Sequence, residues 1–206
     1  MEACNHMMEE PMDLPPVKDR RTVDDHGHDL IDPLGVAIVT VSSSRGAHLG
    51  VDSVTGGDST SIPDESGDTI ARILETNGHR ITARRVIPDE YVRIQTTVSG
   101  LVERSEVDLV VTTGGTGVTI DDVTPDAVAE LFERALPGFG GLFRRLSYEE
   151  VGTRVVATRA VAGIIRGVPV FVLPGSANAV QLATEEIIIR EAPHLAGLAT
   201  RHQYDE

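Results

Sequence analysis

Residues 110–125 read VVTTGGTGVTIDDVTP, and this stretch decides the fold class. Its first residues continue the apolar run that Leu109 begins, without the alternation of a half-exposed strand, which predicts a parallel strand covered on both faces. A helix start follows, with an N-cap hydroxyl at Thr124, Pro125 at the first helical position and the carboxylate of Asp126 in the first turn. A buried strand that leads through a short loop into a helix is typical of an α/β protein.

The loop between that strand and that helix carries Gly114, Gly115 and Gly117. Glycines let the backbone adopt positive φ or approach a ligand closely, and they leave N–H groups free to bind anionic oxygens. Asp121 and Asp122 come next, and carboxylates beside a phosphate repel it unless a divalent cation lies between them. The loop therefore predicts magnesium-bridged phosphate chemistry. GGTG alone is a weak signal, because it is more often a tight turn than a nucleotide site.

Further buried strands are predicted at residues 34–41, 79–87 and 168–173, with amphipathic helices between them. The predicted helices start at Ser66 or Gly67 and close at Gly78, span residues 90–105, start at Pro125, run through residues 139–146 and start at Ala177. Residues 151–163 are ambiguous between a strand and a short extension. Strands that alternate with helices indicate right-handed βαβ units. The predicted fold class is α/β, a three-layer α/β/α sandwich with a mostly parallel sheet.

The chain has 206 residues, enough for one domain with a sound core. Residues 1–32 are acidic and show no periodicity that could bury a face, so we expect a disordered tail there and a single domain over residues 33–206. Cys4 lies in this tail beside several histidines, but no metal-ligand spacing repeats. Residues 42–64 form a loop long enough to be a lid or a mobile insert. Neither a membrane span nor a signal peptide is recognisable, which favours a cytoplasmic location.

The chain is strongly acidic, with 32 acidic and 18 basic residues and a formal charge of −14, and Lys18 is its only lysine. Such a surface is typical of proteins from organisms that hold molar salt, where the Debye length falls to about 3 Å and self-repulsion is screened. An ordinary acidic protein of a mesophile is the alternative. Either way, the absence of a basic patch argues against nucleic acid as a partner.

Polar or flexible residues follow four of the predicted strands, and the carboxyl ends of parallel strands meet at one edge of a sheet. These residues are Ser42, Ser43, Ser44 and Arg45, then Pro88 and Asp89, then the glycine loop with Asp122, and finally Pro174, Gly175 and Ser176. Structural roles compete with ligand binding here: Ser176 is placed to cap the next helix, and Asp89 to cap the helix from Glu90. Asp122 has no such role, because Thr124 already fills the capping position.

Six stretches occur together and in order along the chain: TVSSSR, VIPDE, VVTTGGTGVTIDDVTPDAV, LPGFGGLFRRLSYEEVGT, TRAVAG and VLPGS. They resemble the molybdopterin adenylyltransferases of the MoaB/MogA type, which are related to domains of gephyrin. The resemblance runs from Leu34 to about Leu195, which is nearly the whole predicted domain. LSYEEVGT and TRAVAG are more similar to the MoaB branch.

The resemblance implies Mg²⁺-dependent transfer of an adenylyl group from ATP to the terminal phosphate of molybdopterin, with release of pyrophosphate. Asp89 and Asp122 match the family's catalytic, metal-binding carboxylates. The matching substrate-binding residues are Ser42, Ser43, Ser44, Gly114, Gly115, Thr116, Gly117, Pro174, Gly175 and Ser176. The family also implies a homotrimer or homohexamer. In a chain this acidic, magnesium, loop N–H groups and arginines such as Arg45 or Arg159 must attract the two polyanions.

Two positions depart from the family pattern. Ser43 stands where the family usually has an aspartate, and Asp121 stands where it usually has an arginine. Both changes permit an alternative, a molybdopterin-binding or carrier protein that kept the fold without catalysis. A Rossmann-type dehydrogenase is disfavoured, because the glycine spacing differs from GxGxxG and no acidic residue ends a following strand.

Overall fold

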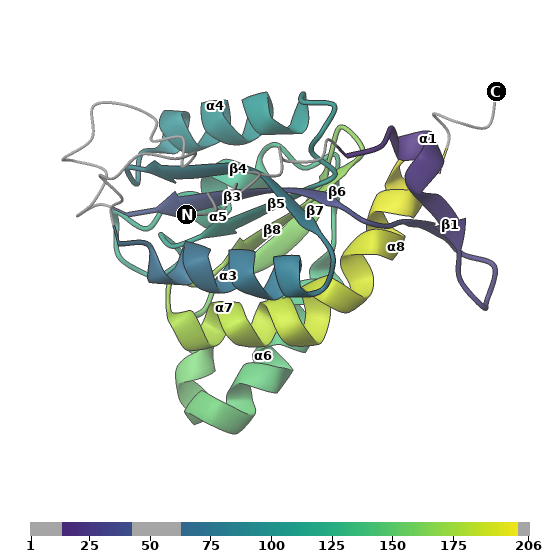
Figure 1. Cartoon of the computed structure of the whole chain (residues 1–206). Coiled ribbons are helices and arrows are strands. Elements are labelled where there is room, and N and C mark those ends of the chain that lie inside the picture. Colours follow the sequence, from purple (N-terminus) through teal and green to yellow (C-terminus); the bar gives the residue numbers. More distant parts are fainter. Residues whose placement is uncertain (1–13, 43–62, 202–206) are drawn as a thin grey trace, which may run out of the picture.

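The computed structural model describes residues 14–42 and 63–201, and these form a three-layer α/β/α sandwich (Figure 1). Its central sheet has the strand order β4-β3-β5-β8-β7-β6. The strands are β3 (Gly35–Val41), β4 (Arg80–Ile87), β5 (Leu109–Thr113), β6 (Arg134–Ala135), β7 (Val161–Ile165) and β8 (Val168–Leu173). Strands β4, β3, β5 and β8 run parallel, and β7 is antiparallel to both of its neighbours. The predicted mostly parallel sheet is confirmed.

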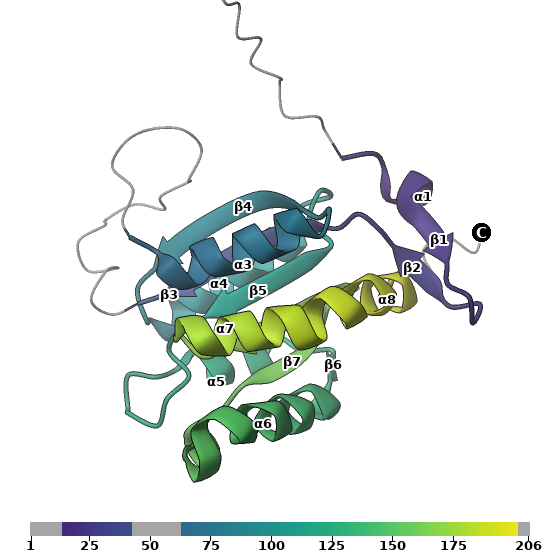
Figure 2. The same ribbon diagram turned by 60° about the horizontal axis from the view of Figure 1, so that its bottom comes forward.

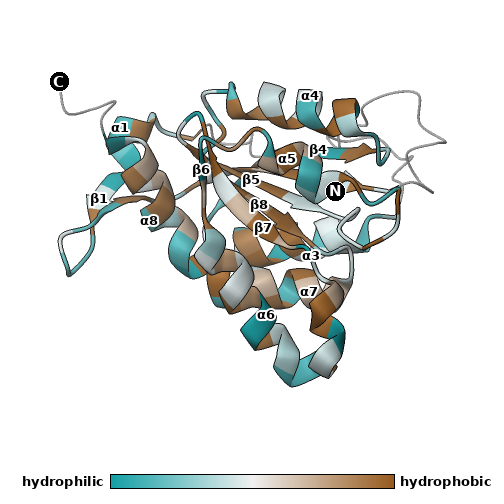
Figure 3. Ribbon diagram, turned by 180° about the vertical axis from the view of Figure 1, so that it is seen from behind, coloured by the Kyte–Doolittle hydropathy of each residue, from teal (hydrophilic) through white to brown (hydrophobic). Residues whose placement is uncertain are grey.

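Helices cover both faces of the sheet (Figure 2). One face carries α3 (Glu65–Thr76), α6 (Pro137–Val151) and a continuous helix built from α7 (Ala177–Ala183), the π-helical turn η2 (Thr184–Ile188) and α8 (Ile189–Ala199). The other face carries α4 (Tyr91–Val102) and α5 (Thr124–Ala129). Strand β3 shows how one sequence serves both layers, since Val36 and Ile38 pack in the first core and Ala37 and Val39 in the second. Figure 3 shows the hydrophobic colour along the central strands β5, β7 and β8 and on parts of the helices that cover them.

Local sequence accounts for most element ends. Asp64 caps α3 by accepting the N–H of Gly67 at 3.1 Å, so this helix begins slightly before the predicted Ser66 or Gly67. Gly78, with φ +87°, follows its end as predicted. The ambiguous residues 151–163 hold a 3₁₀ helix, η1 (Gly152–Ala157), and the start of β7.

The prediction that residues 1–32 are disordered is wrong for residues 14–32, while residues 1–13 lie outside the described part. A short helix, α1 (Val17–Arg20), leads into a hairpin of β1 (Arg21–Val23) and β2 (Asp29–Ile31), which lies beside α8 (Figures 1 and 2). A Cβ on Gly197 of α8 would overlap the carbonyl of Asp29, so the hairpin approaches the helix backbone closely.

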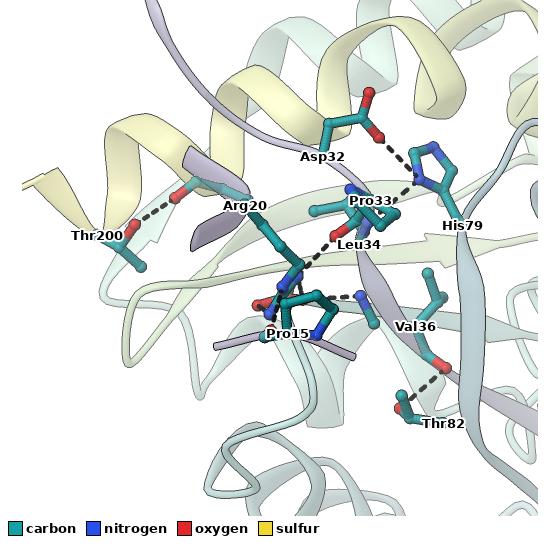
Figure 4. A network of polar contacts seen from close by, with 12 residues as sticks. Pro15, Arg20, Asp32, Pro33, Leu34, Val36, His79, Thr82 and Thr200 are labelled. Carbon is teal, nitrogen blue, oxygen red and sulfur yellow. Dashed lines mark hydrogen bonds and ion pairs between the residues drawn. The ribbon is translucent and has the colours of Figure 1, made fainter. Parts of the chain in front are cut away.

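A buried ion pair attaches this segment to the domain (Figure 4). Arg20 is 3% exposed, and its guanidinium lies 2.6 Å from the carboxylate of Asp108 and 2.6 Å from the carbonyl oxygen of Pro33. Asp108 also accepts the N–H of Gly35 at 2.7 Å. Because this attachment is polar and joins distant residues, it leaves no periodic apolar pattern in the sequence.

His79 supports the same region from the start of β4 (Figure 4). Its Nδ1 accepts the N–H of Leu34 at 3.3 Å and lies 3.7 Å from a carboxylate oxygen of Asp32. Burial lowers the pKa of this imidazole, and the charge of Asp32 opposes the shift. None of the helices in the described residues is long and apolar enough to cross a bilayer.

Candidate functional site

The loops after four parallel strands meet at one edge of the sheet, as predicted. Gly114 donates its N–H to the carbonyl of Leu173 at 3.1 Å, and Ser42 donates to the carbonyl of Ile87 at 3.0 Å. Thr113 Oγ1 donates to the carbonyl of Pro174 at 2.9 Å, which joins the loops after β5 and β8. Ser43, Ser44 and Arg45 belong to the same predicted set but lie outside the described residues.

The glycine loop has the backbone that its sequence predicts. Gly114 and Gly115 have φ of +96° and +61°. A Cβ on Gly114 would overlap the carbonyl of Val41, and one on Gly115 would overlap both Thr124 Oγ1 and the carboxylate of Asp89. The loop is therefore pressed against the end of β3 and against Asp89, which only glycine permits.

Both predicted catalytic carboxylates lie against this loop. Asp89 contacts it at Gly115, and Asp122 contacts it at Gly117, where a Cβ would be 2.6 Å from Asp122 Oδ2. The charge of Asp122 is close enough to Asp89 to raise the pKa of Asp89. The structure thus brings the two carboxylates together, from the loops after β4 and β5.

Asp89 is not a helix cap. Helix α4 begins at Tyr91 with Glu90 as its N-cap, and no side chain bonds the first turn. The Asp89 carboxylate instead accepts one long hydrogen bond, 3.5 Å, from the N–H of Val123. Burial raises the pKa of Asp89, and the charges of Asp122 and Asp121 add to the effect. A cation beside Asp89 would favour its ionised form.

Asp122 does have a structural role, contrary to the prediction. Its Oδ2 accepts the N–H of Thr119 at 2.9 Å and the hydroxyl of Thr119 at 2.5 Å, which closes the turn before α5. These bonds hold the pKa of the Asp122 carboxyl below its usual range. Two bonds do not exhaust the lone pairs of a carboxylate, so Asp122 retains acceptor capacity for a ligand.

Thr124 was wrongly predicted as the N-cap of α5. The helix begins at Thr124 itself, with Val123 before it and no side-chain capping bond. The Thr124 hydroxyl is buried beside Gly115 and has no hydrogen-bond partner within the described protein. An unpaired buried hydroxyl is costly, which indicates that a group outside the described residues completes this part of the site.

Ser176 caps α7, accepting the N–H of Ala179 at 3.4 Å. The structural role of this serine is confirmed, and direct contact with a ligand stays a prediction. Gly175 packs against Gly114, with only 3.3 Å from its ideal Cβ to the Cα of Gly114.

Two cavities open beside the glycine loop. The first, of about 230 Å³, lies between the ends of β3 and β5 and the start of α3. Its lining includes Thr40, Ser42, Ser66, Gly114 and Gly175. The second, of about 310 Å³, lies towards α6. Its lining includes Thr116, Gly117, Pro174, Ser176, Phe143 and Leu182.

The second cavity contains polar groups that the sequence did not reveal. Ser147 Oγ and Thr158 Oγ1 line it, are buried, and have no hydrogen-bond partner within the described protein. Ser147 directly follows the amphipathic helix predicted through residues 139–146, so its spacing gives no functional signal. Both hydroxyls can donate to or accept from a polar edge of a bound molecule.

Asp64 was also missed. It is 6% exposed and accepts hydrogen bonds from Thr40 Oγ1 at 2.9 Å and from Arg84 at 3.1 Å, besides the N–H of Gly67. It therefore fixes the end of β3 and the start of α3 on either side of the first cavity. The only sequence signal was an aspartate directly before a helix, at the end of a long polar stretch.

Magnesium suits this donor set. Mg²⁺ in proteins is usually held by one or two carboxylates and completed by substrate phosphates and water. Asp89 and Asp122 supply two such carboxylates, and the bond that Asp89 accepts from the described residues is long, at 3.5 Å, while burial raises its pKa. In the part of the chain that the structure describes, no group of three or more His, Cys, Asp or Glu side chains could hold a metal ion.

A glycine loop, two carboxylates and two cavities at the carboxyl edge of a parallel sheet are typical of the α/β proteins that bind small molecules. The chain belongs to the family described as "Probable molybdopterin binding domain", whose model matches residues 37–194. Molybdenum cofactor biosynthesis protein B of Bacillus subtilis is 36% identical over 175 residues, covering 84% of this chain and 95% of the relative. The protein of the same name from Halalkalibacterium halodurans is 40% identical over 133 residues, covering 64% and 78%.

Solved structures agree with this membership. The crystal structure described as "tungsten cofactor synthesizing protein MoaB from Pyrococcus furiosus" superposes with a TM-score of 0.69 at 36% identity, covering 82% of this chain and 98% of that one. The fold inferred from the sequence, a MoaB/MogA-like sandwich, is confirmed.

Proposed function

We propose that this chain acts in molybdenum cofactor biosynthesis as a molybdopterin adenylyltransferase. The observation that carries the proposal is the placement of Asp89 and Asp122 against one glycine loop at the edge of the sheet. Family membership and the names of its relatives support molybdopterin as the ligand. The substrates would be molybdopterin and ATP, with Mg²⁺ as the metal.

The reaction is a nucleotidyl transfer. An oxygen of the terminal phosphate of molybdopterin attacks the α-phosphorus of ATP, and the bond from that phosphorus to the bridging oxygen breaks, so that pyrophosphate leaves with the electron pair. The attacking phosphate is already anionic at neutral pH and needs no strong base. Bound magnesium would neutralise charge between the two polyanions and on the leaving group.

The residues of this chain bind and align. Asp89 and Asp122 would hold the metal, and loop N–H groups from Gly114 to Gly117 would bind phosphate oxygens. The second cavity offers the apolar walls and unpaired hydroxyls that a flat heterocycle such as a pterin requires, at Phe143, Ser147 and Thr158. Because the reaction depends on alignment and charge, it needs no nucleophilic side chain activated by a triad.

A molybdopterin carrier without transferase activity is the second candidate. Asp121 favours it, because this carboxylate stands where the family usually has an arginine and its charge raises the pKa of Asp89. A further negative charge beside a site for two polyanions weakens their binding unless the metal compensates.

The deciding experiment mixes the purified chain with molybdopterin, Mg²⁺ and ATP labelled at the α-phosphate, in high salt. Release of pyrophosphate with label on the pterin supports the transferase. Binding of molybdopterin without pyrophosphate supports the carrier. Absence of binding rejects both.

We also propose a homotrimer or homohexamer. Several large apolar side chains of α6 and η1 are exposed in the single chain. They are Leu142, Tyr148, Val151 and Val156. Sedimentation analysis would test this, and a monomer at micromolar concentration would reject it.

A further inference from the structure

Arg159 lies between η1 and β7, and its side chain reaches the segment that carries Asp122. Each of its three guanidinium nitrogens donates to that segment. Nε donates to the carbonyl of Gly117 at 2.8 Å, Nη2 donates to the carbonyl of Asp122, and Nη1 pairs with Asp126 at 2.8 Å. One guanidinium thus joins the end of the glycine loop, the proposed metal-binding residue and the first turn of α5.

Among the described residues, those between Gly117 and Asp122 have few other contacts that hold them. Val118 is 72% exposed and Ile120 is 92% exposed, so the tip of the segment buries no apolar side chain. Within the tip, Asp122 and Thr119 bond one another through side chain and backbone. That turn fixes its own shape, whereas Arg159 fixes where the turn sits relative to the domain.

We infer that Arg159 is a positioning residue, which anchors the turn so that Asp122 faces Asp89 across the glycine loop. This inference rests on the proposed function and goes beyond it. The three bonds use three of the five guanidinium N–H groups, so attraction of substrate polyanions by Arg159 stays a separate prediction. Lysine could not reproduce the role, since an ammonium lacks the planar fork that reaches three separate acceptors.

The electrostatics agree with the geometry. Burial raises the pKa of Asp89, and the charge of Arg159 acts against this shift. Hydrogen bonds from Thr119 lower the pKa of Asp122, and the charge of Arg159 adds to this shift. Arg159 therefore favours the ionised form of the two carboxylates as well as their placement. The side chain of Arg159 is 33% exposed, so the hydrogen bonds matter more to this role than the screened charge.

The first test measures amide hydrogen exchange of Val123 and Thr124, whose N–H groups donate to Asp89 and to the carbonyl of Gly115 and so report where the turn lies. It compares the ligand-free wild type with Arg159→Ala, Arg159→Lys and Arg190→Ala. Arg190 is a matched control, because it is an exposed arginine that pairs with Glu186 on a helix. We expect exchange at both amides to be about tenfold faster in Arg159→Ala, between wild type and that value in Arg159→Lys, and unchanged in Arg190→Ala. Unchanged exchange in Arg159→Ala overturns the inference.

The second test uses pyrophosphate release in the same variants. We expect Arg159→Ala to need about tenfold or more Mg²⁺ for half-maximal rate, with the KM for ATP at saturating Mg²⁺ within about twofold of wild type. A raised KM for ATP or molybdopterin at saturating Mg²⁺ would instead mean that Arg159 binds substrate, and would overturn the inference. If the wild type releases no pyrophosphate, the proposed transferase fails, while the exchange measurement still decides the role of Arg159.

Discussion

Asp122 has two roles, since its carboxylate accepts hydrogen bonds within the turn and keeps acceptor capacity for a metal. Substitution by asparagine should preserve the first role and remove the second. Asparagine keeps one side-chain oxygen for the N–H and hydroxyl of Thr119, so the turn should persist. It removes the negative charge that a metal requires. We expect Asp122→Asn to lower the rate of pyrophosphate release about 100-fold or more, with an unchanged melting temperature. Undiminished turnover would remove Asp122 from the mechanism.

Among the described residues, Asp89 accepts one long hydrogen bond, and it does not cap α4, so these contacts of its carboxylate contribute little to stability. Asp89→Asn should therefore lower turnover about as much as Asp122→Asn without reducing the free energy of unfolding. Parallel urea unfolding and rate measurements check this. A clear loss of stability in Asp89→Asn would show that the residue has the structural role that its contacts do not indicate.

Elements with a periodic pattern were predictable from the sequence, and elements held by single distant contacts were not. Strand β8 was predicted with its observed bounds, because a buried strand shows as an unbroken apolar run. The glycine loop and the meeting of Asp89 with Asp122 followed from the rule that ligands bind beyond the carboxyl ends of parallel strands. Helix caps were less predictable. Helix α5 starts one residue earlier than predicted, so Thr124 is its first residue and not its cap, and the Thr124 hydroxyl has no partner among the described residues.

The element formed by α1 and its hairpin was missed, because Arg20 and Asp108 are 88 positions apart. This gives a test. Arg20→Met leaves the buried Asp108 carboxylate without its cationic partner, so the free energy of unfolding should fall by about 3–5 kcal/mol. Lys18→Met in the same helix is the control, because Lys18 is exposed, and it should have little effect. Equal free energies of unfolding of the two variants in urea would mean that the ion pair of Arg20 does not stabilise the attachment of α1 and its hairpin.

The junction of α3 and β4 should respond to pH through His79. The pKa of its imidazole is lowered from 6.5 by burial, so the folded state binds fewer protons than the unfolded state once the pH falls through 6.5. The contribution of the neutral His79 imidazole to the free energy of unfolding is then fully present above pH 6.5 and decreases as the pH falls below 6.5. His79→Asn offers an oxygen near the position of Nδ1 for the N–H of Leu34 without titrating. We expect a flatter dependence of unfolding free energy on pH from 7.5 to 5.5 in His79→Asn, and an equal slope in both proteins would contradict this.

At the scale of the whole molecule, a formal charge of −14 opposes both folding and the function proposed here. Like charges on the compact state repel one another, and the same field repels ATP and molybdopterin as they approach. Salt weakens both effects, because the Debye length shrinks from about 10 Å at 0.1 M to about 3 Å at 1 M. The attraction that the metal and the loop N–H groups exert acts over shorter distances, so salt weakens it less than it weakens the long-range repulsion.

The acidic surface therefore predicts a protein that works better in concentrated salt. Raising KCl from 0.1 to 2 M should raise the melting temperature. At fixed free Mg²⁺ it should also lower the KM for ATP, because salt screens the long-range repulsion of ATP more than it weakens the short-range attraction at the site. Sucrose, which stabilises by exclusion without screening charge, is the control: it should raise the melting temperature without lowering the KM. If KCl raised the KM for ATP instead, attraction at the site would outweigh the field of the whole molecule, and the excess of acidic residues would have no bearing on substrate capture.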